Sequence, residues 1–184
     1  MRIVVGITGS TGIIYGIRML EVLKKSKIET HLIMSEWAKK CLTLETKYDL
    51  KYVKSLADSY SDDSNMAASV SSGTYKTDGM IVIPCSMKTL SSIANGYDET
   101  LVARAAGVTI KEARKLVLVT RETPLSSIHL ENMLKLAKLG VTIMPAAPGF
   151  YNKPENMTDL VDFMVARMLD HLSIEHDLVV RWGQ

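Results

Sequence analysis

The sequence has few of the residues that build metal centres, disulfide frameworks or membrane spans. Its 184 residues include two cysteines, Cys41 and Cys85, whose spacing matches neither a metal site nor a redox motif. The four histidines are scattered and form no H-E-x-x-H pattern, which argues against a bound metal. No apolar run approaches about 20 residues, so we expect no membrane span. The first residues lack the apolar segment of a signal peptide, and we expect a cytoplasmic protein.

An excess of charge of one sign is also missing. The chain carries 22 Lys and Arg residues against 20 Asp and Glu residues, a formal net charge of +2. This balance indicates neither a nucleic-acid partner nor an anionic membrane surface. The composition, 47% hydrophobic and 23% charged, is typical of a globular protein. From the length we expect a single domain over residues 1–184.

What the sequence does contain is a regular alternation of apolar runs and helical patterns. The five expected strands are Arg2–Ile7, Glu29–Met34, Gly79–Pro84, Lys115–Thr120 and Val141–Pro145. The expected helices are Gly12–Lys25, Glu36–Leu44, Met87–Ala94, Glu99–Arg114, Ile128–Leu139 and Thr158–Leu172. Such alternation predicts a three-layer α/β fold, a parallel sheet with helices on both faces. Residues 55–73 show little periodicity and are expected to form a long loop or an irregular helix.

A glycine-spaced turn, Gly6, Gly9 and Gly12, joins the first expected strand to the first helix. Glycines let backbone N–H groups approach an anion, and the N-terminus of the next helix attracts it. The spacing departs from G-x-G-x-x-G, and the second strand ends at Ser35 where a dinucleotide site needs an acidic residue. The turn therefore favours a mononucleotide phosphate, the alternative being a tight turn without a ligand.

Small and polar residues follow the carboxyl end of each expected strand, where parallel sheets bind their ligands. Hydroxyls of Ser35, Ser86 and Thr89 can bond a phosphate or cap a helix. The guanidinium of Arg121 suits a phosphate or a flavin-ring oxygen, or else pairs with Glu122. The segments concerned are Thr8–Thr11, Ser35, Cys85–Thr89, Arg121–Pro124 and Ala146–Tyr151.

Three cations lie on expected helices. Arg104 and Lys111 are seven residues apart, so a helix that is not split at Gly107 places them on one face, where they bracket a phosphate or simply form a solvated basic face. Arg167 falls within the apolar arc of its helix, which predicts a buried arginine paired with a carboxylate or a ligand phosphate. His171 lies in the same arc and is expected to be a core histidine.

Local sequence decides little about three further residues. Glu45 directly follows the second expected helix, and a glutamate at this place by itself indicates no function. Tyr151 belongs to an aromatic turn and either bonds a phosphate or anchors the loop. Trp182, near the C-terminus, either packs over a neighbouring chain or closes the tail.

Six stretches together form a specific combination: Gly6–Gly12, Tyr75–Met80, Pro84–Met87, Arg121–Met133, Pro145–Tyr151 and Arg181–Gly183. The strings R-E-T-P-L-S-S-I-H-L-E-N-M and P-A-A-P-G-F-Y are the most distinctive. With them the chain resembles the UbiX/Pad-type flavin prenyltransferases. The resemblance implies a Rossmann/flavodoxin-like fold, a homododecamer, and FMN bound at a subunit interface.

The resemblance also implies a reaction. Members of the family join the dimethylallyl group of dimethylallyl monophosphate to N5 and C6 of reduced FMN, without a metal. The product, prenylated FMN, serves a UbiD-type decarboxylase of aromatic or unsaturated acids.

Site residues carry over from the same resemblance, by their match to the family motifs. Implied FMN contacts are Gly9, Ser10, Thr11, Ser35, Ser86, Met87, Lys88, Thr89 and Arg121. Implied contacts of the prenyl phosphate are Arg104, Lys111, Glu122, Tyr151 and Arg167, some from neighbouring subunits. Catalytic roles fall to Arg104, Lys111 and Glu122, to Glu45 as an acid/base, and to Trp182 near the site.

Two positions depart from the family pattern: Thr11 replaces a commoner serine, and Lys88 stands where a small residue is usual.

Three other functions compete with this one. The first is an FMN-dependent decarboxylase of phenolic acids, on which the sequence makes no separate demand. The second is a flavin carrier, which would need no second phosphate site and is therefore disfavoured by Arg104, Lys111 and Arg167. A peptidyl-cysteine decarboxylase needs a histidine after the first strand–helix turn, and the sequence has none there.

Overall fold

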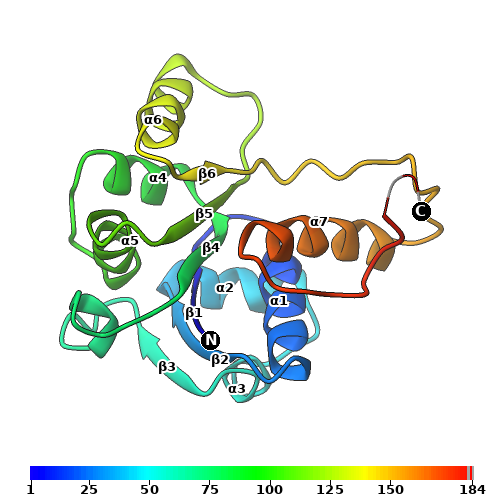
Figure 1. Ribbon diagram of the computed structural model, residues 1–184, viewed down its shortest axis with the longest axis horizontal. Coiled ribbons are helices and arrows are strands. Elements are labelled where there is room, and N and C mark those ends of the chain that lie inside the picture. The colour runs from blue at the N-terminus through cyan, green and yellow to red at the C-terminus, as the bar shows by residue number, and fades with distance from the viewer. Residues whose placement is uncertain (182, 184) are drawn as a thin grey trace.

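The computed structural model describes residues 1–181 and 183, and its centre is one parallel sheet. The strand order is β3-β2-β1-β4-β5-β6, and every neighbouring pair is parallel. Figure 1 shows this sheet with helices on either side. The strands are β1 (Arg2–Ile7), β2 (Glu29–Met34), β3 (Ser59–Asp62), β4 (Gly79–Cys85), β5 (Lys115–Thr120) and β6 (Thr142–Ile143).

Helices cover both faces of the sheet and so confirm the expected three-layer α/β fold. α1 and α7 pack together on one face, while α4 and α5 pack on the other, with α6 resting on α4. The helices are α1 (Ile13–Lys25), α2 (Glu36–Glu45), α3 (Leu50–Ser55), α4 (Met87–Ala94), α5 (Leu101–Lys111), α6 (Ser127–Lys138) and α7 (Met157–His171), with a 3-10 turn η1 at Ser69–Ser71.

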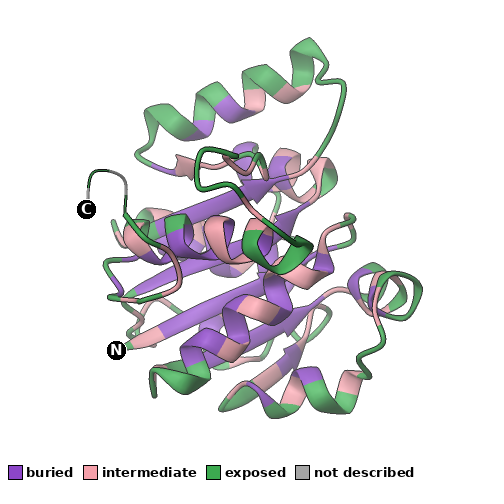
Figure 2. Ribbon diagram, turned by 90° about the vertical axis from the view of Figure 1, so that its right-hand side faces the viewer, coloured by how far each residue is buried: buried purple, intermediate pink, exposed green. Residues whose placement is uncertain are grey.

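The sheet separates two hydrophobic cores because successive side chains of a strand point to opposite faces. In β4, Ile81 and Ile83 belong to the core beneath α1 and α7, whereas Met80 and Val82 belong to the core beneath α4 and α5. All seven residues of β4 are buried, as expected for a central parallel strand. Figure 2 shows this burial running along the strands.

The structure differs from the sequence prediction in several segments, among them the unexpected helix α3 and the last strand, which is only Thr142–Ile143. Residues 55–73 hold the edge strand β3, which the sequence analysis missed because its Ser-Tyr-Ser-Asp sequence lacks the apolar run of an inner strand. The helix expected at Glu99–Arg114 is shorter, since Thr100 caps it at Leu101 and it ends at Lys111. It is continuous through Gly107, so Arg104 and Lys111 do share one helix.

Candidate functional site

The sheet reverses its strand order beside β1, which has β2 on one side and β4 on the other. Ligands of such folds bind outside the carboxyl ends of the strands at this point. A cavity of about 160 Å³ lies there. It brings together five of the expected FMN residues: Gly9, Ser35, Ser86, Lys88 and Thr89. Its other lining residues are Thr8, Trp37, Asp63, Ser92 and Thr100.

Three helix N-termini meet at this cavity, because the residues that cap them line it. Ser35 accepts the Ala38 N–H at the start of α2, at 3.1 Å. Ser86 accepts the Thr89 N–H at the start of α4, at 3.3 Å. Thr100 caps α5 in the same way. The positive ends of three helix dipoles and several hydroxyls therefore surround one space, an environment that favours a phosphate.

Thr8 fixes the ends of β1 and β4 relative to each other. Its hydroxyl donates to the Pro84 carbonyl at 2.8 Å and accepts the Ser86 N–H at 2.9 Å. Next to it, Gly9 lies so close to α2 that an added Cβ would overlap the Cβ of Trp37. This position therefore requires a glycine, because any side chain would collide with Trp37, which also lines the cavity.

The N-terminus of α1, where the glycine turn predicted a phosphate cradle, is filled by a side chain of this protein. Gly12 has a φ of 99°, a left-handed conformation that favours glycine, and precedes the helix. Its N–H and that of Ile13 donate to Glu45 Oε2, at 2.8 and 3.3 Å. In this structure the first N–H groups of α1 therefore bind the carboxylate of the exposed residue Glu45, at the turn where the sequence predicts a ligand phosphate.

Arg121 presents an unsatisfied donor beside the glycine turn. The Ser10 hydroxyl donates to the Arg121 carbonyl at 3.0 Å. The Nε of Arg121 is buried and has no hydrogen-bond partner among the described residues. Glu122 is exposed, and its carboxylate accepts the Thr123 N–H. A buried guanidinium N–H without a partner is costly, so it fits an oxygen of a bound flavin nucleotide.

Asp63 is a cavity residue that the sequence analysis missed, because it follows the unpredicted strand β3. Burial raises the pKa of its carboxyl group, against the opposing effects of hydrogen bonds from Val102 and Thr100 and of the Lys88 charge. Its carboxylate accepts the Val102 N–H at 2.8 Å. Asp63 therefore ties the end of β3 to the start of α5.

The cations expected at the prenyl phosphate are each paired elsewhere in this chain. Arg104 binds Asp98 and the Ser71 carbonyl, both at 3.0 Å. Lys111 pairs with Glu112 at 3.0 Å, at the end of α5 opposite the cavity. The eleven residues of α5 extend about 16 Å, so one protomer does not bring Lys111 to its own cavity.

Arg167 is not buried, contrary to the sequence prediction. Its side chain is 51% exposed and pairs with Asp170 at 3.1 Å. The buried side of α7 includes Val161, Val165 and Met168, and at 100° per residue Arg167 projects from the other side of the helix. His171 is exposed as well, so the expectation of a core histidine is also wrong.

Tyr151 lies in the loop before α7, and its ring meets Phe163 edge-on at 5.5 Å. Phe163 and the segment Leu178–Val180 line a separate cavity of about 380 Å³.

Of the other expected site residues, Thr11 is exposed and Met87 half-buried. Trp182 lies outside the described residues.

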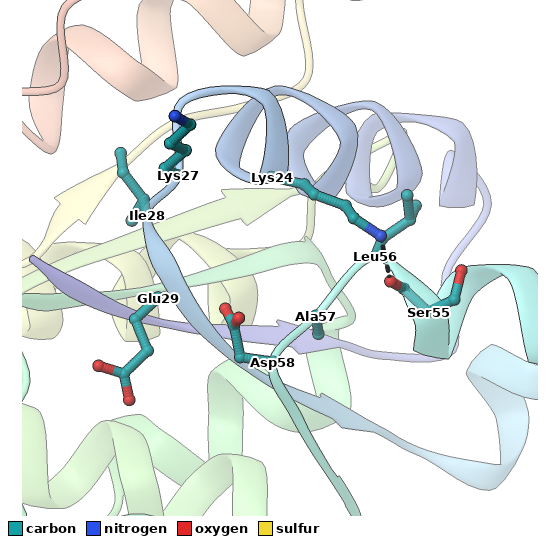
Figure 3. A pocket seen from close by; sticks show the side chains of 8 residues that line it. All are labelled: Lys24, Lys27, Ile28, Glu29, Ser55, Leu56, Ala57 and Asp58. Atoms are coloured by element: carbon teal, nitrogen blue, oxygen red, sulfur yellow. Dashed lines mark hydrogen bonds between the residues drawn. The ribbon is translucent and has the colours of Figure 1, made fainter.

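Another cavity, of about 390 Å³, lies at the opposite, amino-terminal edge of the sheet (Figure 3). Two of its polar side chains bond to the backbone of the fold: Lys24 donates to the Ser55 carbonyl, and Asp58 accepts the Thr30 N–H. It contains none of the expected site residues. Among the described residues, no group of His, Cys, Asp and Glu could hold a metal ion, and no helix is long and apolar enough to cross a membrane.

Comparisons with known proteins identify the family to which the chain belongs. The family model described as Flavoprotein matches residues 1–169. A probable UbiX-like flavin prenyltransferase of Escherichia coli O157:H7 is 52% identical over 183 residues, covering 99% of this chain and 93% of the relative.

Two crystal structures share the fold closely. The structure of AnUbiX in complex with FMN and dimethylallyl pyrophosphate has a TM-score of 0.98 at 48% identity, covering 100% and 97% of the two chains. A dodecameric FMN-dependent UbiX-like decarboxylase from E. coli O157:H7 has a TM-score of 0.97 at 52% identity, covering 100% of both chains. The chain therefore belongs to the flavoprotein family and, within it, to the UbiX-like flavin prenyltransferases.

Proposed function

We propose that this protein is a flavin prenyltransferase. It joins the dimethylallyl group of dimethylallyl monophosphate to N5 and C6 of reduced FMN, and the prenylated FMN serves a UbiD-type decarboxylase. The observation that carries the proposal is the cavity at the ends of β1 and β4, where hydroxyls and three helix N-termini converge. Arg121, which follows β5 and does not line this cavity, adds a buried Nε without a hydrogen-bond partner among the described residues. This donor-rich environment fits an anionic flavin nucleotide.

In this proposal FMN is held by the residues that surround the cavity and the glycine turn. Ser35, Ser86 and Thr89 supply hydroxyls and helix N–H groups for its phosphate. Arg121 supplies a charged donor. The remaining contacts are Gly9, Ser10, Thr11, Met87 and Lys88. Reduced FMN, when bound, supplies the nucleophilic flavin atoms.

The prenyl donor is an anion, and the residues proposed to bind it are mostly cationic. Arg104, Lys111 and Arg167 stabilise the charge that develops on the phosphate as the allylic C–O bond breaks. Glu122 and Tyr151 complete this set. Glu45 moves a proton during ring closure, and the helix N–H groups that bind its Oε2 hold it in place. Trp182 is assigned near the site from the family motif.

The proposal includes a homododecamer with sites at subunit interfaces. Pockets for small ligands usually measure about 300–1,000 Å³, whereas the cavity in one chain measures about 160 Å³. Lys111 and Arg167 also lie outside this cavity. Both observations support a site completed by neighbouring subunits.

The proposal takes residues 1–184 as one FMN-binding domain, supported by the single sheet that joins β1 to β6. It also places the enzyme in the cytoplasm. The free thiols of Cys41 and Cys85 support a reducing compartment.

The test is anaerobic incubation of the purified protein with reduced FMN and dimethylallyl monophosphate, followed by mass spectrometry of the extracted flavin. A gain of one C5H8 unit is expected. Arg167→Ala is expected to abolish this gain while FMN binding survives. Unmodified FMN from the folded, flavin-bound wild type would overturn the proposal in favour of a carrier or a decarboxylase.

A further inference from the structure

Asp170, near the end of α7, binds three side chains at once. Its Oδ2 accepts from Nη1 of Arg167 at 3.1 Å. Its Oδ1 accepts from Nη2 of Arg181 at 2.9 Å and lies 3.2 Å from Nε2 of His176. Two arginines fourteen residues apart in the sequence are therefore neighbours on one carboxylate.

His176 anchors this cluster from the interior. Its side chain is 2% exposed. The Leu178 N–H donates to its Nδ1 at 3.4 Å, so in the neutral ring Nε2 carries the proton and donates to Asp170. Buried Ile174 holds the same segment against the core. The fold of this segment is what brings Arg181 back to α7.

The cluster carries more positive than negative charge. Asp170 supplies one carboxylate against the guanidinium groups of Arg167 and Arg181. Burial alone would raise the pKa of Asp170, but Arg181 and His176 outweigh it and lower that pKa. The carboxylate is therefore ionised at neutral pH and holds both arginines.

Most donors of the two arginines remain available. A guanidinium has five N–H groups, and within the described part of the chain Asp170 is the one hydrogen-bond partner of each arginine. Their side chains are 51% and 49% exposed. Adjacent guanidinium groups with free N–H donors match the oxygens of a phosphate.

We propose that Arg181 is a further phosphate-binding residue of the prenyl-donor site, and that Asp170 is the positioning residue that sets it beside Arg167. The inference rests on the proposed function, which gives Arg167 to the donor phosphate. Asp170 lies one turn from Arg167 on α7, whereas the proximity of Arg181 to Arg167 depends on how the C-terminal segment folds back, so sequence reasoning could not find Arg181.

The test measures donor binding without turnover. The protein loaded with oxidised FMN, which lacks the reduced nucleophile, is titrated with dimethylallyl monophosphate in a calorimeter. Arg181→Met is expected to raise the Kd about tenfold or more, the loss of one charge-assisted hydrogen bond. Arg181→Lys should recover part of this loss. Lys51→Met, which removes an exposed charge on α3, should leave the Kd unchanged.

Two further readouts separate phosphate binding from a structural role of the cluster. With reduced FMN, Arg181→Met should raise the KM for the donor while kcat changes by less than about threefold. Asp170→Asn should weaken donor binding too, and the double variant Asp170→Asn/Arg181→Met should bind no more weakly than Arg181→Met alone, because the two residues act together.

Each negative result has a distinct meaning. Wild-type donor affinity in Arg181→Met overturns the role of Arg181, and fully additive losses in the double variant overturn the positioning role of Asp170. If the proposed function itself is wrong, the wild-type protein forms no prenylated flavin from reduced FMN and dimethylallyl monophosphate. That result is distinct from both outcomes for the variants.

Discussion

Glu45 illustrates how one side chain gains a defined place from tertiary contacts. Its carboxylate accepts the first N–H groups of α1, which a helix leaves without partners of its own. The same arrangement fixes the carboxylate next to the glycine turn. A residue that looks ordinary in the sequence thus becomes the anion of the α1 N-terminus.

Glu45→Gln keeps an acceptor oxygen for these N–H groups but removes the charge. We expect the free energy of unfolding to fall by no more than about 1 kcal/mol, FMN binding to persist, and single-turnover prenyl transfer to slow by about 100-fold or more, since proton transfer is lost. Glu36→Gln, on the same helix, is the control for loss of a surface charge. Wild-type turnover in Glu45→Gln would exclude a proton-transfer role.

His31 is a buried titratable residue outside the proposed site. Its Nε2 lies 3.1 Å from the Ser61 hydroxyl. Burial, and then the charge of Arg2, lower its pKa from the usual value of 6.5. Folding therefore favours the neutral ring, and this contribution to stability is present above pH 6.5 and is lost as the pH falls below it.

We expect the wild type to lose more stability between pH 7.5 and 5.5 than His31→Gln, whose side chain does not titrate. Urea unfolding at the two pH values measures the difference. His171→Gln, which removes an exposed histidine, should retain the wild-type pH dependence. An equal loss in wild type and His31→Gln would contradict the assignment.

At the scale of the element, helix α4 shows a cap that also faces a ligand cavity. Ser86 accepts the Thr89 N–H at 3.3 Å and lines the cavity. Ser126 caps α6 with the same geometry, a 3.3 Å bond from the His129 N–H, but lies away from the cavity. The two serines form a matched pair for separating stability from binding.

Alanine at either position should lower the free energy of unfolding by about 1 kcal/mol, the usual cost of a lost N-cap. Only Ser86→Ala should also weaken FMN binding, measured by flavin fluorescence titration, because only Ser86 offers its hydroxyl to the ligand. Equal FMN affinities in the two variants would exclude Ser86 from the flavin site.

At the scale of the whole molecule, apolar side chains remain on the outside of one chain. Leu130 and Leu134 on α6 are 51% and 56% exposed, and Phe150 and Met157 near the start of α7 are 68% and 71% exposed. Exposed apolar surface of this kind marks protein interfaces. It agrees with the proposed assembly and with a cavity too small to enclose a flavin nucleotide alone.

Leu134→Lys is expected to weaken the assembly, because a charge would be buried at a subunit contact. Analytical ultracentrifugation should detect smaller species, and FMN binding and prenyl transfer should fall together. Ser26→Lys adds the same charge at an exposed polar position and should leave the assembly intact. A dissociated Leu134→Lys that keeps full activity would argue against sites shared between subunits.

The sequence by itself determined the layered fold and the main cavity residues. Buried parallel strands require continuous apolar runs, so β1, β2, β4 and β5 were predictable from periodicity. Since the carboxyl ends of parallel strands share one edge, the polar residues after them were expected together, and Gly9, Ser35, Ser86, Lys88 and Thr89 do line one cavity.

Only the tertiary structure decided the rest, because these features depend on contacts between distant segments. β3 is an edge strand with a polar sequence, so its sequence did not predict a strand. The cavity residue Asp63, which follows β3, was missed for the same reason. The exposure of Arg167 depends on which face of α7 packs against α1. The spacing of the apolar residues in the sequence did not determine that face. Glu45 reaches Gly12 across 33 residues and Arg181 reaches Asp170 across 11, and no local pattern encodes such contacts.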